Sequence, residues 1–277
     1  MYEIIKKNEL ATKIKQLEIK APLIARKSKP GQFVILRVRK KGERIPLTFA
    51  DWNRDKGTIT LVFDEVGLTT RLLGALKVGD KILDISGPLG VPSVIKNYGT
   101  VAVVSGGVGV ATSYNIIKAL KKAGNRIISI IGAKTQQQLI FENKIKQNSD
   151  ELYISTNDGT KGHKGVVSDV LKNLIENNYY FDLVYAIGPP LMMKAVVDLA
   201  KNYEIKSVVS LNCIMVDGCG MCGACRITIG DNTKFACIDG PEFDGGIVDF
   251  DELILRLNAF RQKEIQALKN YEKNLSA

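Results

Sequence analysis

The first 96 residues contain short runs of alternating or β-branched residues, separated by turn-forming residues. Alternation of apolar and polar positions is typical of strands with one buried face. The expected strands cover residues 2–5, 12–19, 33–38, 57–63 and 81–85, with a turn at residues 29–32. Such closely spaced strands predict a small antiparallel β-barrel.

The pattern changes near Asn97, where apolar runs begin to alternate with helix-like stretches. Residues 100–105 form a continuous apolar run, as in a parallel strand that is covered on both faces. Further strands are expected at 126–132, 152–156 and 183–187, and helices at 111–122, 138–147, 166–177 and 192–202. This alternation predicts a doubly wound, nucleotide-binding α/β domain.

The remaining chain predicts a cysteine-rich loop and then a long charged helix from about Asp251 to the end. The helix carries an apolar stripe of Leu253, Ile254, Leu257, Phe260, Ile265 and Leu268. Such a stripe fits either a helix packed on its own chain or one that docks on a partner subunit. The predicted organisation is therefore a barrel (residues 1–96), an α/β domain (97–206) and a loop with a C-terminal helix (207–277).

All five cysteines of the chain lie between residues 213 and 237. Glycines within the loop let the backbone wrap tightly and turn N–H groups inward, which suits a negatively charged, sulfur-rich cluster. Three interpretations are open: an iron–sulfur cluster, a disulfide framework, or structural zinc. The zinc ligands would be Cys219, Cys222, Cys225 and Cys237.

The spacing of the cysteines favours iron and sulfur. Plant-type [2Fe–2S] loops have the pattern C-x4-C-x2-C followed by a distant cysteine, and Cys222, Cys225 and Cys237 fit the last three places. The first place holds Asp217, whose carboxylate can bind ferric iron; Cys219 could take that place after a local rearrangement. The C-x2-C-x2-C run also suggests a [4Fe–4S] cluster, but the C-x3-C-P ending of that motif is absent.

Composition leaves the chemistry to cofactors, because the chain has a single histidine, His163. We predict no catalytic side chain. The net charge of +10 favours an acidic protein partner or a solvated surface, and no nucleic-acid motif is found. The start of the chain lacks a signal peptide, and no apolar run reaches the roughly 18–20 residues of a membrane span. We therefore expect a soluble, cytoplasmic protein without membrane contact.

The barrel half contains three segments suited to a flavin. An arginine, a hydroxyl and a glycine–threonine loop are groups that bind a flavin pyrophosphate and ring. The candidate residues are Arg44, Pro46, Leu47 and Thr48 in the first segment, Gly67, Thr69 and Thr70 in the second, and Gly87 and Pro88 in the third.

The α/β half contains a strand, a glycine turn and a helix, an arrangement that directs backbone N–H groups and a helix dipole at a phosphate. The turn reads G-x-G-x-x-T, which is short of the full dinucleotide fingerprint. Nucleotides bind beyond the carboxyl ends of such strands, and the candidates there are Gly106, Gly107, Gly109, Asp158, Gly188 and Pro189. We expect His163 to be a loop residue, and Met192 and Met193 to serve in packing.

This order of motifs resembles the ferredoxin–NADP reductase superfamily: R-x-P-L-T in a barrel, then GGVG and GPP, then the cysteine loop. It is most similar to the branch of the dihydroorotate dehydrogenase electron-transfer subunit. Within that branch it resembles the small (alpha) subunit family of NADH-dependent ferredoxin:NADP oxidoreductase, also called the sulfide dehydrogenase beta subunit. The resemblance covers nearly the whole chain and is most specific over residues 215–245.

The resemblance implies FAD on the barrel, with Arg44 on its phosphates and Thr48 near its ring. It implies NAD(H) or NADP(H) on the α/β domain, and a [2Fe–2S] cluster held by Asp217, Cys222, Cys225 and Cys237. Cys219 and Cys213 depart from the family pattern, which expects threonine and proline there. Cys219 therefore keeps the fourth ligand open, whereas Cys213 is expected to be a small buried residue.

The predicted function is hydride exchange between NAD(P)H and FAD, followed by single-electron transfer through the cluster to a larger flavin- and iron–sulfur-containing subunit. In the whole complex the resemblance implies electron bifurcation between NADP and ferredoxin. The first alternative is an electron-transfer subunit for dihydroorotate dehydrogenase or another oxidoreductase. The second is a zinc-stapled nucleotide-binding regulator. The sequence singles out no position that decides between NADH and NADPH.

Overall fold

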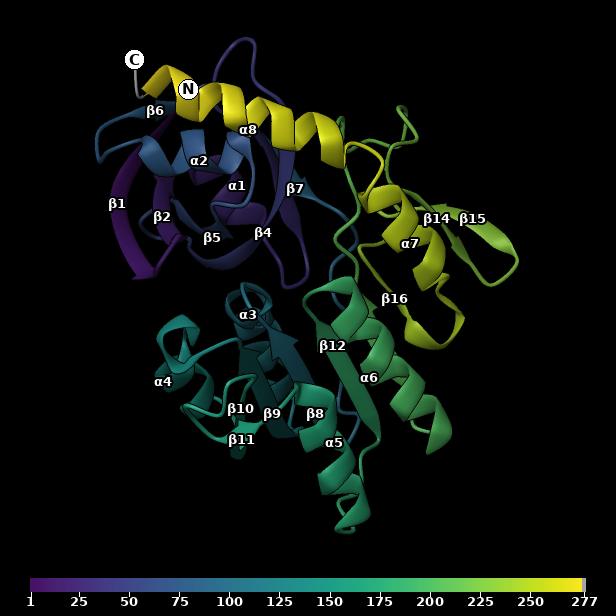
Figure 1. Cartoon of the computed structure of the whole chain (residues 1–277). Helices are drawn as coiled ribbons and strands as arrows, with labels where there is room; N and C mark the ends of the chain where they lie inside the picture. Colours follow the sequence, from purple (N-terminus) through teal and green to yellow (C-terminus); the bar gives the residue numbers. More distant parts are fainter. Residues whose placement is uncertain (276–277) are drawn as a thin grey trace.

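We describe a computed structural model that covers residues 1–275. Its N-terminal part is a seven-stranded antiparallel sheet in the order β6-β1-β2-β5-β4-β3-β7, which curls into a near-closed barrel (Figure 1). The strands are β1 (Tyr2–Ala11), β2 (Ile14–Lys20), β3 (Phe33–Arg37), β4 (Arg44–Asn53), β5 (Thr58–Asp64), β6 (Lys81–Ile82) and β7 (Asp84–Leu89). Two helices, α1 (Pro22–Lys27) and α2 (Leu68–Ala75), complete this barrel domain.

Strand β4 is absent from the strands that the sequence predicts, although it carries the predicted flavin segment. Its first five residues are all only partly buried, and its pairing with β5 shifts register between Phe49 and Asp51. A proline and a bulge weaken the alternation by which a strand is recognised. The single strand predicted at 81–85 is divided between β6 and β7.

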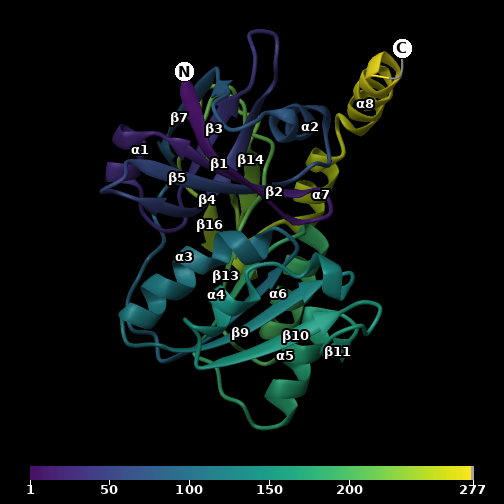
Figure 2. The same cartoon turned by 90° about the vertical axis from the view of Figure 1, so that its left-hand side faces the viewer.

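The second sheet has the order β11-β10-β9-β8-β12-β13-β16. Its parallel strands are β8 (Thr100–Gly106), β9 (Arg126–Ala133), β10 (Glu151–Thr156), β11 (His163–Lys164), β12 (Leu183–Ile187) and β13 (Ser207–Ser210). Helix α3 (Gly109–Lys122) lies between this sheet and the barrel, while α5 (Val167–Glu176) and α6 (Pro190–Asn202) cover the other face (Figure 2). The predicted fold class, a barrel joined to a doubly wound α/β domain, is confirmed.

One predicted helix of this domain is wrong in extent. Residues 138–147 contain the end of a short 3₁₀ helix (Gln136–Gln138) and only five α-helical residues in α4 (Glu142–Lys146). Phe141 precedes α4 with a φ of 57°, in the left-handed region. A bulky residue with that backbone geometry cannot continue a right-handed helix.

The last part of the chain completes the second sheet as well as forming the cysteine loop. Strand β16 (Glu242–Asp244) pairs antiparallel with β13, and β14 (Arg226–Ile229) and β15 (Asn232–Phe235) form a hairpin. The boundary at residue 206 stays a prediction, and β13 and β16 show that the sheet extends beyond it.

The predicted single C-terminal helix is two helices. Helix α7 (Phe250–Leu257) is capped by Asn258, and α8 (Arg261–Leu275) begins three residues after that cap. Leu253 is buried, whereas Phe260 and Ile265 are exposed, so the apolar stripe is only partly covered by this chain. Helix α8 lies beside α2, where Arg71 and Glu272 form an ion pair of 2.5 Å (Figure 1). The predicted continuation to residue 277 lies outside the described residues.

Three apolar cores hold the parts together. One fills the barrel, and a second joins barrel residues such as Ala50 and Val62 to helix α3. The third runs from α5 and α6 to the cysteine loop and includes Phe33 and Ile35 of β3. Within residues 1–275, no helix is long and apolar enough to cross a membrane.

Candidate functional site

The predicted flavin residues gather around strand β3. Ile35 of β3 is opposite Pro46 on one side and Ser86 on the other. Phe33 is likewise opposite Thr48 and Leu89. The segment 44–48 and the pair Gly87–Pro88 therefore lie on the two strands that flank β3, although about 40 residues separate them in the chain.

Arg44 has hydrogen-bonding capacity that the protein leaves unused. Its Nη2 donates to Ser86 Oγ at 3.3 Å, and its Nη1 lies 3.6 Å from Asp84 Oδ2. The buried Nε atoms of Arg44 and Arg37 have no hydrogen-bond partner among the described residues. Buried donors are rarely left unpaired, so these two guanidinium groups fit an anionic ligand such as a pyrophosphate.

The second segment, Gly67 to Thr70, forms the start of helix α2. The Gly67 N–H donates to Thr70 Oγ1 at 3.0 Å, and Thr69 Oγ1 donates to Glu43 Oε2 at 2.6 Å. Glu43 immediately precedes β4, so the Thr69 hydroxyl ties the helix to the first flavin segment. Both hydroxyls thus have structural partners within the chain.

Gly67 itself has no steric reason to be glycine. Its φ of −125° is open to any residue, and an added Cβ would have no heavy atom within 4 Å among the described residues. A glycine in open space with ordinary backbone geometry fits a position that a ligand approaches closely. This observation, together with the unpaired arginine donors, is compatible with the expected FAD.

The nucleotide residues lie where the strand order of the second sheet reverses. Strand β8 lies between β9 and β12, so the chain turns to opposite sides after β8. Gly106, Gly107 and Gly109 follow β8, and Gly188 and Pro189 follow β12. The crevice at such a reversal is where open α/β sheets bind nucleotides.

Close packing explains most of these glycines. A Cβ on Gly109 would lie 2.4 Å from the Ile187 carbonyl oxygen, and one on Gly188 would lie 3.1 Å from the Gly106 carbonyl oxygen. Gly107 is different, since its φ is 57° and a Cβ there would meet no described atom within 4 Å. The backbone is thus closely packed at Gly109 and Gly188, whereas it is open at Gly107, beside the N-terminus of α3.

Asp158 lies beyond the end of β10, two strands away from β8. Hydrogen bonds from the hydroxyl and N–H of Thr160, at 2.7 and 3.0 Å, lower the pKa of its exposed carboxyl. His163 lies in the short edge strand β11 rather than in a loop, 3.8 Å from Asp169. Met193 is fully buried, as predicted, while Met192 lies over Gly106 and Gly188 at the crevice.

The cysteine loop has a buried and an exposed half. Cys225 and Cys237 are buried and linked by a hydrogen bond from the Cys237 N–H to Cys225 Sγ at 3.4 Å. Burial, together with the nearby Cys225 sulfur, raises the pKa of Cys237 to about 12. Cys219 and Cys222 are exposed, and Cys213 is buried as predicted.

Asp217 binds the backbone of this loop. Its two carboxylate oxygens accept the N–H groups of Cys219 at 3.0 Å and Cys222 at 2.6 Å, and these bonds lower the pKa of the carboxyl. Within residues 1–275, no three His, Cys, Asp or Glu side chains are arranged to hold a metal ion. Asp217 nevertheless accepts the N–H of one predicted ligand, Cys222, and the other two, Cys225 and Cys237, contact each other. One carboxylate and three thiols are donors of the kind that bind iron in an iron–sulfur cluster.

The loop packs directly against the flavin segments. A Cβ on Gly218 would lie 2.7 Å from Leu89 Cδ1 and 2.8 Å from Ile35 Cδ1. Leu89 follows Pro88, and Ile35 is opposite Pro46. The backbone next to Asp217 is therefore in contact with the strands that carry the predicted flavin residues.

The sequence did not single out three polar residues that the structure places at these sites. Asn115 of α3 is buried and donates to the Phe49 carbonyl at 3.1 Å, beside Thr48. Arg226 and Arg256 donate to loop carbonyls between Cys222 and Cys225. None of these residues is part of a recognisable motif, and only the tertiary structure brings them to the sites.

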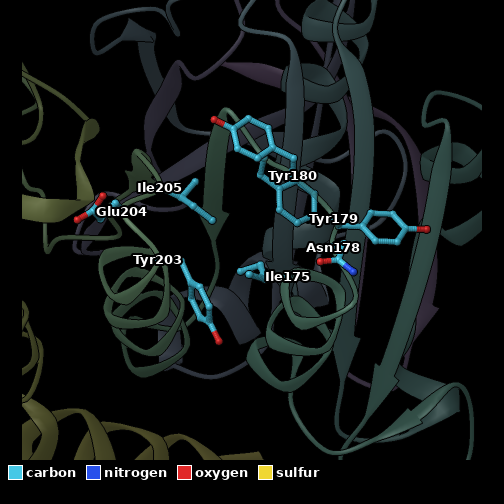
Figure 3. A pocket seen from close by; sticks show the side chains of 8 residues that line it. Ile175, Asn178, Tyr179, Tyr180, Tyr203, Glu204 and Ile205 are labelled. Carbon is cyan, nitrogen blue, oxygen red and sulfur yellow. The ribbon is translucent and has the colours of Figure 1, made fainter.

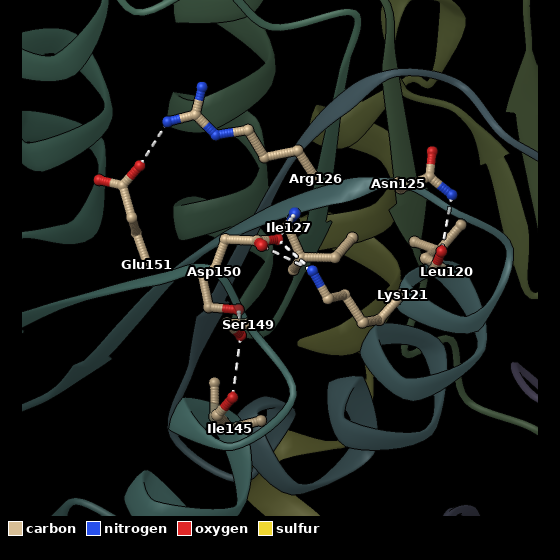
Figure 4. Close-up of polar contacts among 10 residues, drawn as sticks. Leu120, Lys121, Asn125, Arg126, Ile127, Ile145, Ser149, Asp150 and Glu151 are labelled. Atoms are coloured by element: carbon tan, nitrogen blue, oxygen red, sulfur yellow. Dashed lines mark hydrogen bonds and ion pairs between the residues drawn. The ribbon is translucent and has the colours of Figure 1, made fainter.

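The amino-terminal edge of the strands in the second sheet, opposite the nucleotide residues, carries a pocket and a group of ion pairs. A cavity of about 370 Å³ lies there among the ends of α5 and α6, lined by Tyr179, Tyr180 and Tyr203 (Figure 3). Nearby, Asp150 accepts hydrogen bonds from Lys121 and from the Ile127 N–H, and Arg126 pairs with Glu151 (Figure 4). This is the amino-terminal edge of the strands, away from the predicted cofactor sites.

Two protein families match the chain. Residues 103–198 match the oxidoreductase NAD-binding domain, and residues 212–249 match the iron–sulfur cluster binding domain of dihydroorotate dehydrogenase B. The second match contains the whole cysteine-rich run. It favours iron–sulfur over the zinc and disulfide interpretations.

Relatives that align over nearly the whole chain agree with these two family matches. A Thermotoga maritima homologue of the dihydroorotate dehydrogenase B (NAD(+)) electron transfer subunit is 49% identical over 95% of this chain and 92% of its own. The Fusobacterium nucleatum electron transfer subunit is 32% identical, with 88% and 95% covered. A solved structure of an NADH-dependent reduced ferredoxin–NADP oxidoreductase, described for flavin-based electron bifurcation, shares 47% identity and a TM-score of 0.93, with 98% of both chains covered.

The fold, the sites and these matches define an oxidoreductase subunit with flavin- and NAD(P)-binding domains and an iron–sulfur domain. The chain belongs to the family of dihydroorotate dehydrogenase B electron-transfer subunits and their homologues, within the ferredoxin–NADP reductase superfamily. The predicted family is confirmed.

Proposed function

We propose that this chain passes electrons from NADH, through FAD and a [2Fe–2S] cluster, to a larger partner subunit. The observation that carries the proposal is the contact of Gly218 with Leu89 and Ile35. It places the cluster loop against the strands that carry the predicted flavin residues. Nicotinamide gives up two electrons together, whereas an iron–sulfur cluster accepts one at a time. FAD can accept the pair and release the electrons singly.

The residues of this chain would bind and orient the flavin and the nicotinamide nucleotide. The partly exposed Arg44 guanidinium would bind the flavin phosphates, and Thr48 lies on the strand that would face the ring. The open backbone at Gly107 and the start of α3 receive the nucleotide phosphates. Asp158 is proposed as an acceptor for ribose hydroxyls, and because its carboxylate would repel a 2′-phosphate we propose NADH rather than NADPH.

For the cluster we propose Asp217, Cys222, Cys225 and Cys237 as ligands. Asp217 takes the first place of the C-x4-C-x2-C spacing, and its carboxylate accepts the N–H groups of both Cys219 and Cys222. Asp217→Asn keeps an acceptor for the loop N–H groups but removes the anionic ligand, so we expect it to lose the cluster. Asp217→Cys and Cys219→Ser should retain it. Iron analysis of the three variants decides, and loss of iron in Cys219→Ser alone would assign the fourth ligand to Cys219.

The proposed exit for electrons is the exposed half of the loop. Met221 is 88% exposed, and Val216 and Ile238 are also exposed apolar residues of the loop region. Such side chains on a soluble subunit are typical of a protein contact. Because the structure with a TM-score of 0.93 comes from a bifurcating NADH-dependent ferredoxin–NADP oxidoreductase, we propose a partner of that kind, with ferredoxin reached through the complex.

The alternative partner is a dihydroorotate dehydrogenase. The match of residues 212–249 to the iron–sulfur domain of that enzyme favours it. The experiment is co-purification of the chain with its native partner, followed by assays of NADH with either NADP and reduced ferredoxin or orotate. Turnover with NADP and ferredoxin supports the first partner, and turnover with orotate alone supports the second. Absence of flavin from the purified complex would contradict both.

A further inference from the structure

Two arginines flank the backbone between Cys222 and Cys225. Arg226 Nη1 donates to the Gly223 carbonyl at 3.1 Å, and Arg256 Nη2 donates to the Ala224 carbonyl at 3.1 Å. They come from different elements, because Arg226 begins β14 and Arg256 lies in the last turn of α7. Two consecutive carbonyls of the loop are thus held by positive charges.

These bonds also fix the direction of the intervening peptide groups. A trans peptide unit is planar, so its C=O and N–H point in opposite directions. Holding the Gly223 and Ala224 carbonyls on the arginine side turns the N–H groups of Ala224 and Cys225 to the other side. N–H groups that point at cluster sulfurs stabilise added negative charge, as do nearby cations.

Arg256 is the better placed of the two. Its side chain is partly buried and lies beside Ala224, Cys213 and Leu253, whereas Arg226 is exposed. Within the described residues, the Arg256 guanidinium forms no ion pair with a carboxylate. Glu252, one turn earlier on α7, instead accepts the Thr228 N–H at 2.7 Å. The charge of Arg256 is therefore left to act on the loop.

We propose that Arg256, with a smaller contribution from Arg226, raises the reduction potential of the iron–sulfur cluster. A cluster held by three thiolates and a fourth anion is negatively charged and gains one more negative charge on reduction. A cation close to the loop stabilises the reduced state more than the oxidised state. The sign is the same whether Asp217 or Cys219 is the fourth ligand, because both are anionic when bound.

The test is an anaerobic redox titration of the full-length chain, followed by the electron paramagnetic resonance signal of the reduced cluster. In Arg256→Gln we expect the equilibrium between oxidised and reduced cluster to shift about tenfold toward the oxidised form. For a one-electron couple this lowers the midpoint potential by about 59 mV. Arg226→Gln should shift it less and in the same direction. Arg256→Lys keeps the charge and should stay near the parent.

Lys122→Gln removes one exposed charge at the far end of α3 and is the matched control; its potential should equal the parent's. If Arg256→Gln retains the cluster and has the potential of the parent, the proposal is overturned. It is also overturned if Arg256→Lys or the control shows the same shift as Arg256→Gln. If Arg256→Gln does not retain iron, the exposed Arg226→Gln decides, and an unchanged potential there overturns the proposal. The inference rests on the iron–sulfur function, and iron content of the parent tests that function separately.

Discussion

The nucleotide crevice and the cysteine loop are built on opposite principles. In the crevice, backbone contacts fix the geometry: a Cβ on Gly109 would collide with the Ile187 carbonyl oxygen at 2.4 Å, and one on Gly188 would lie 3.1 Å from the Gly106 carbonyl oxygen, closer than an ordinary contact. In the loop, Cys225 and Cys237 are buried while Cys219 and Cys222 are exposed, and the Asp217 carboxylate is occupied by backbone N–H groups.

The difference teaches that the two kinds of cofactor impose different demands. A nucleotide that binds and leaves repeatedly gains from a rigid, preformed wall, because little order has to be created at each binding event. A cluster that stays bound can complete its own site, because metal binding and local folding are linked. Backbone changes should therefore damage the crevice, and ligand changes should damage the loop.

The largest effect is expected from loss of a buried thiolate. Cys225→Ser should abolish the cluster, because a hydroxyl is a poor substitute for a soft thiolate ligand. Iron content and visible circular dichroism measure the loss. Cys213→Ser is the control, since Cys213 is equally buried but is not a proposed ligand. A cluster that is lost from the control and kept in Cys225→Ser would reverse the assignment.

The next effect concerns the crevice. Gly109→Ala places a Cβ 2.4 Å from the Ile187 carbonyl oxygen, and the backbone has to move apart. We expect a loss of about 1–3 kcal/mol of unfolding free energy and weaker NADH binding, measured by denaturant unfolding and by nucleotide titration. Iron content should not change. Unaltered stability and affinity would show that the crevice is not rigid.

Gly67→Ala separates ligand contact from protein packing. No described atom lies within 4 Å of the added Cβ, so we expect the apoprotein to lose at most about 1 kcal/mol, the usual cost of alanine at a helix N-cap. FAD affinity should fall about tenfold, since a methyl group would intrude on the bound flavin. Fluorescence titration of the apoprotein with FAD measures this. An unchanged dissociation constant would remove Gly67 from the flavin site.

The smallest effect is expected at the amino-terminal edge, away from both sites. Burial opposes ionisation of Asp150, but hydrogen bonds from Lys121 and Ile127 outweigh it and lower the pKa below its ordinary 3.8. A lowered folded-state pKa stabilises the protein above the unfolded-state pKa, and this is lost as pH falls through the folded-state value. Asp150→Asn should therefore cost about 1 kcal/mol at pH 7.

The cost of Asp150→Asn should shrink below about pH 4, where the parent carboxyl begins to take up a proton. Urea unfolding at a series of pH values measures the difference between parent and variant. Glu176→Gln, in the exposed pair with Lys172, provides a matched control with little effect at any pH. A difference that grows as the pH falls would contradict the assigned direction of the pKa shift.

The sequence predicts the regular parts of this fold well, because β8 is a continuous apolar strand and α3 follows a glycine turn. It misses β4, whose proline and bulge interrupt the alternation, and it joins α7 to α8 across Asn258. Motifs located the candidate glycines and cysteines. Asn115 and Arg256 escaped because a hydrogen bond to a distant carbonyl leaves no local sequence pattern, and the choice between Asp217 and Cys219 depends on side-chain movement around the metal.

The most direct measurement is an anaerobic reaction of the purified chain with NADH, followed by flavin absorbance and by electron paramagnetic resonance. The account predicts that the flavin band bleaches and that the signal of a reduced [2Fe–2S] cluster appears in the same chain. A colourless protein that contains zinc would contradict the account. So would a reduced flavin beside an intact cluster that stays oxidised, if the midpoint potential of that cluster lies within reach of NADH.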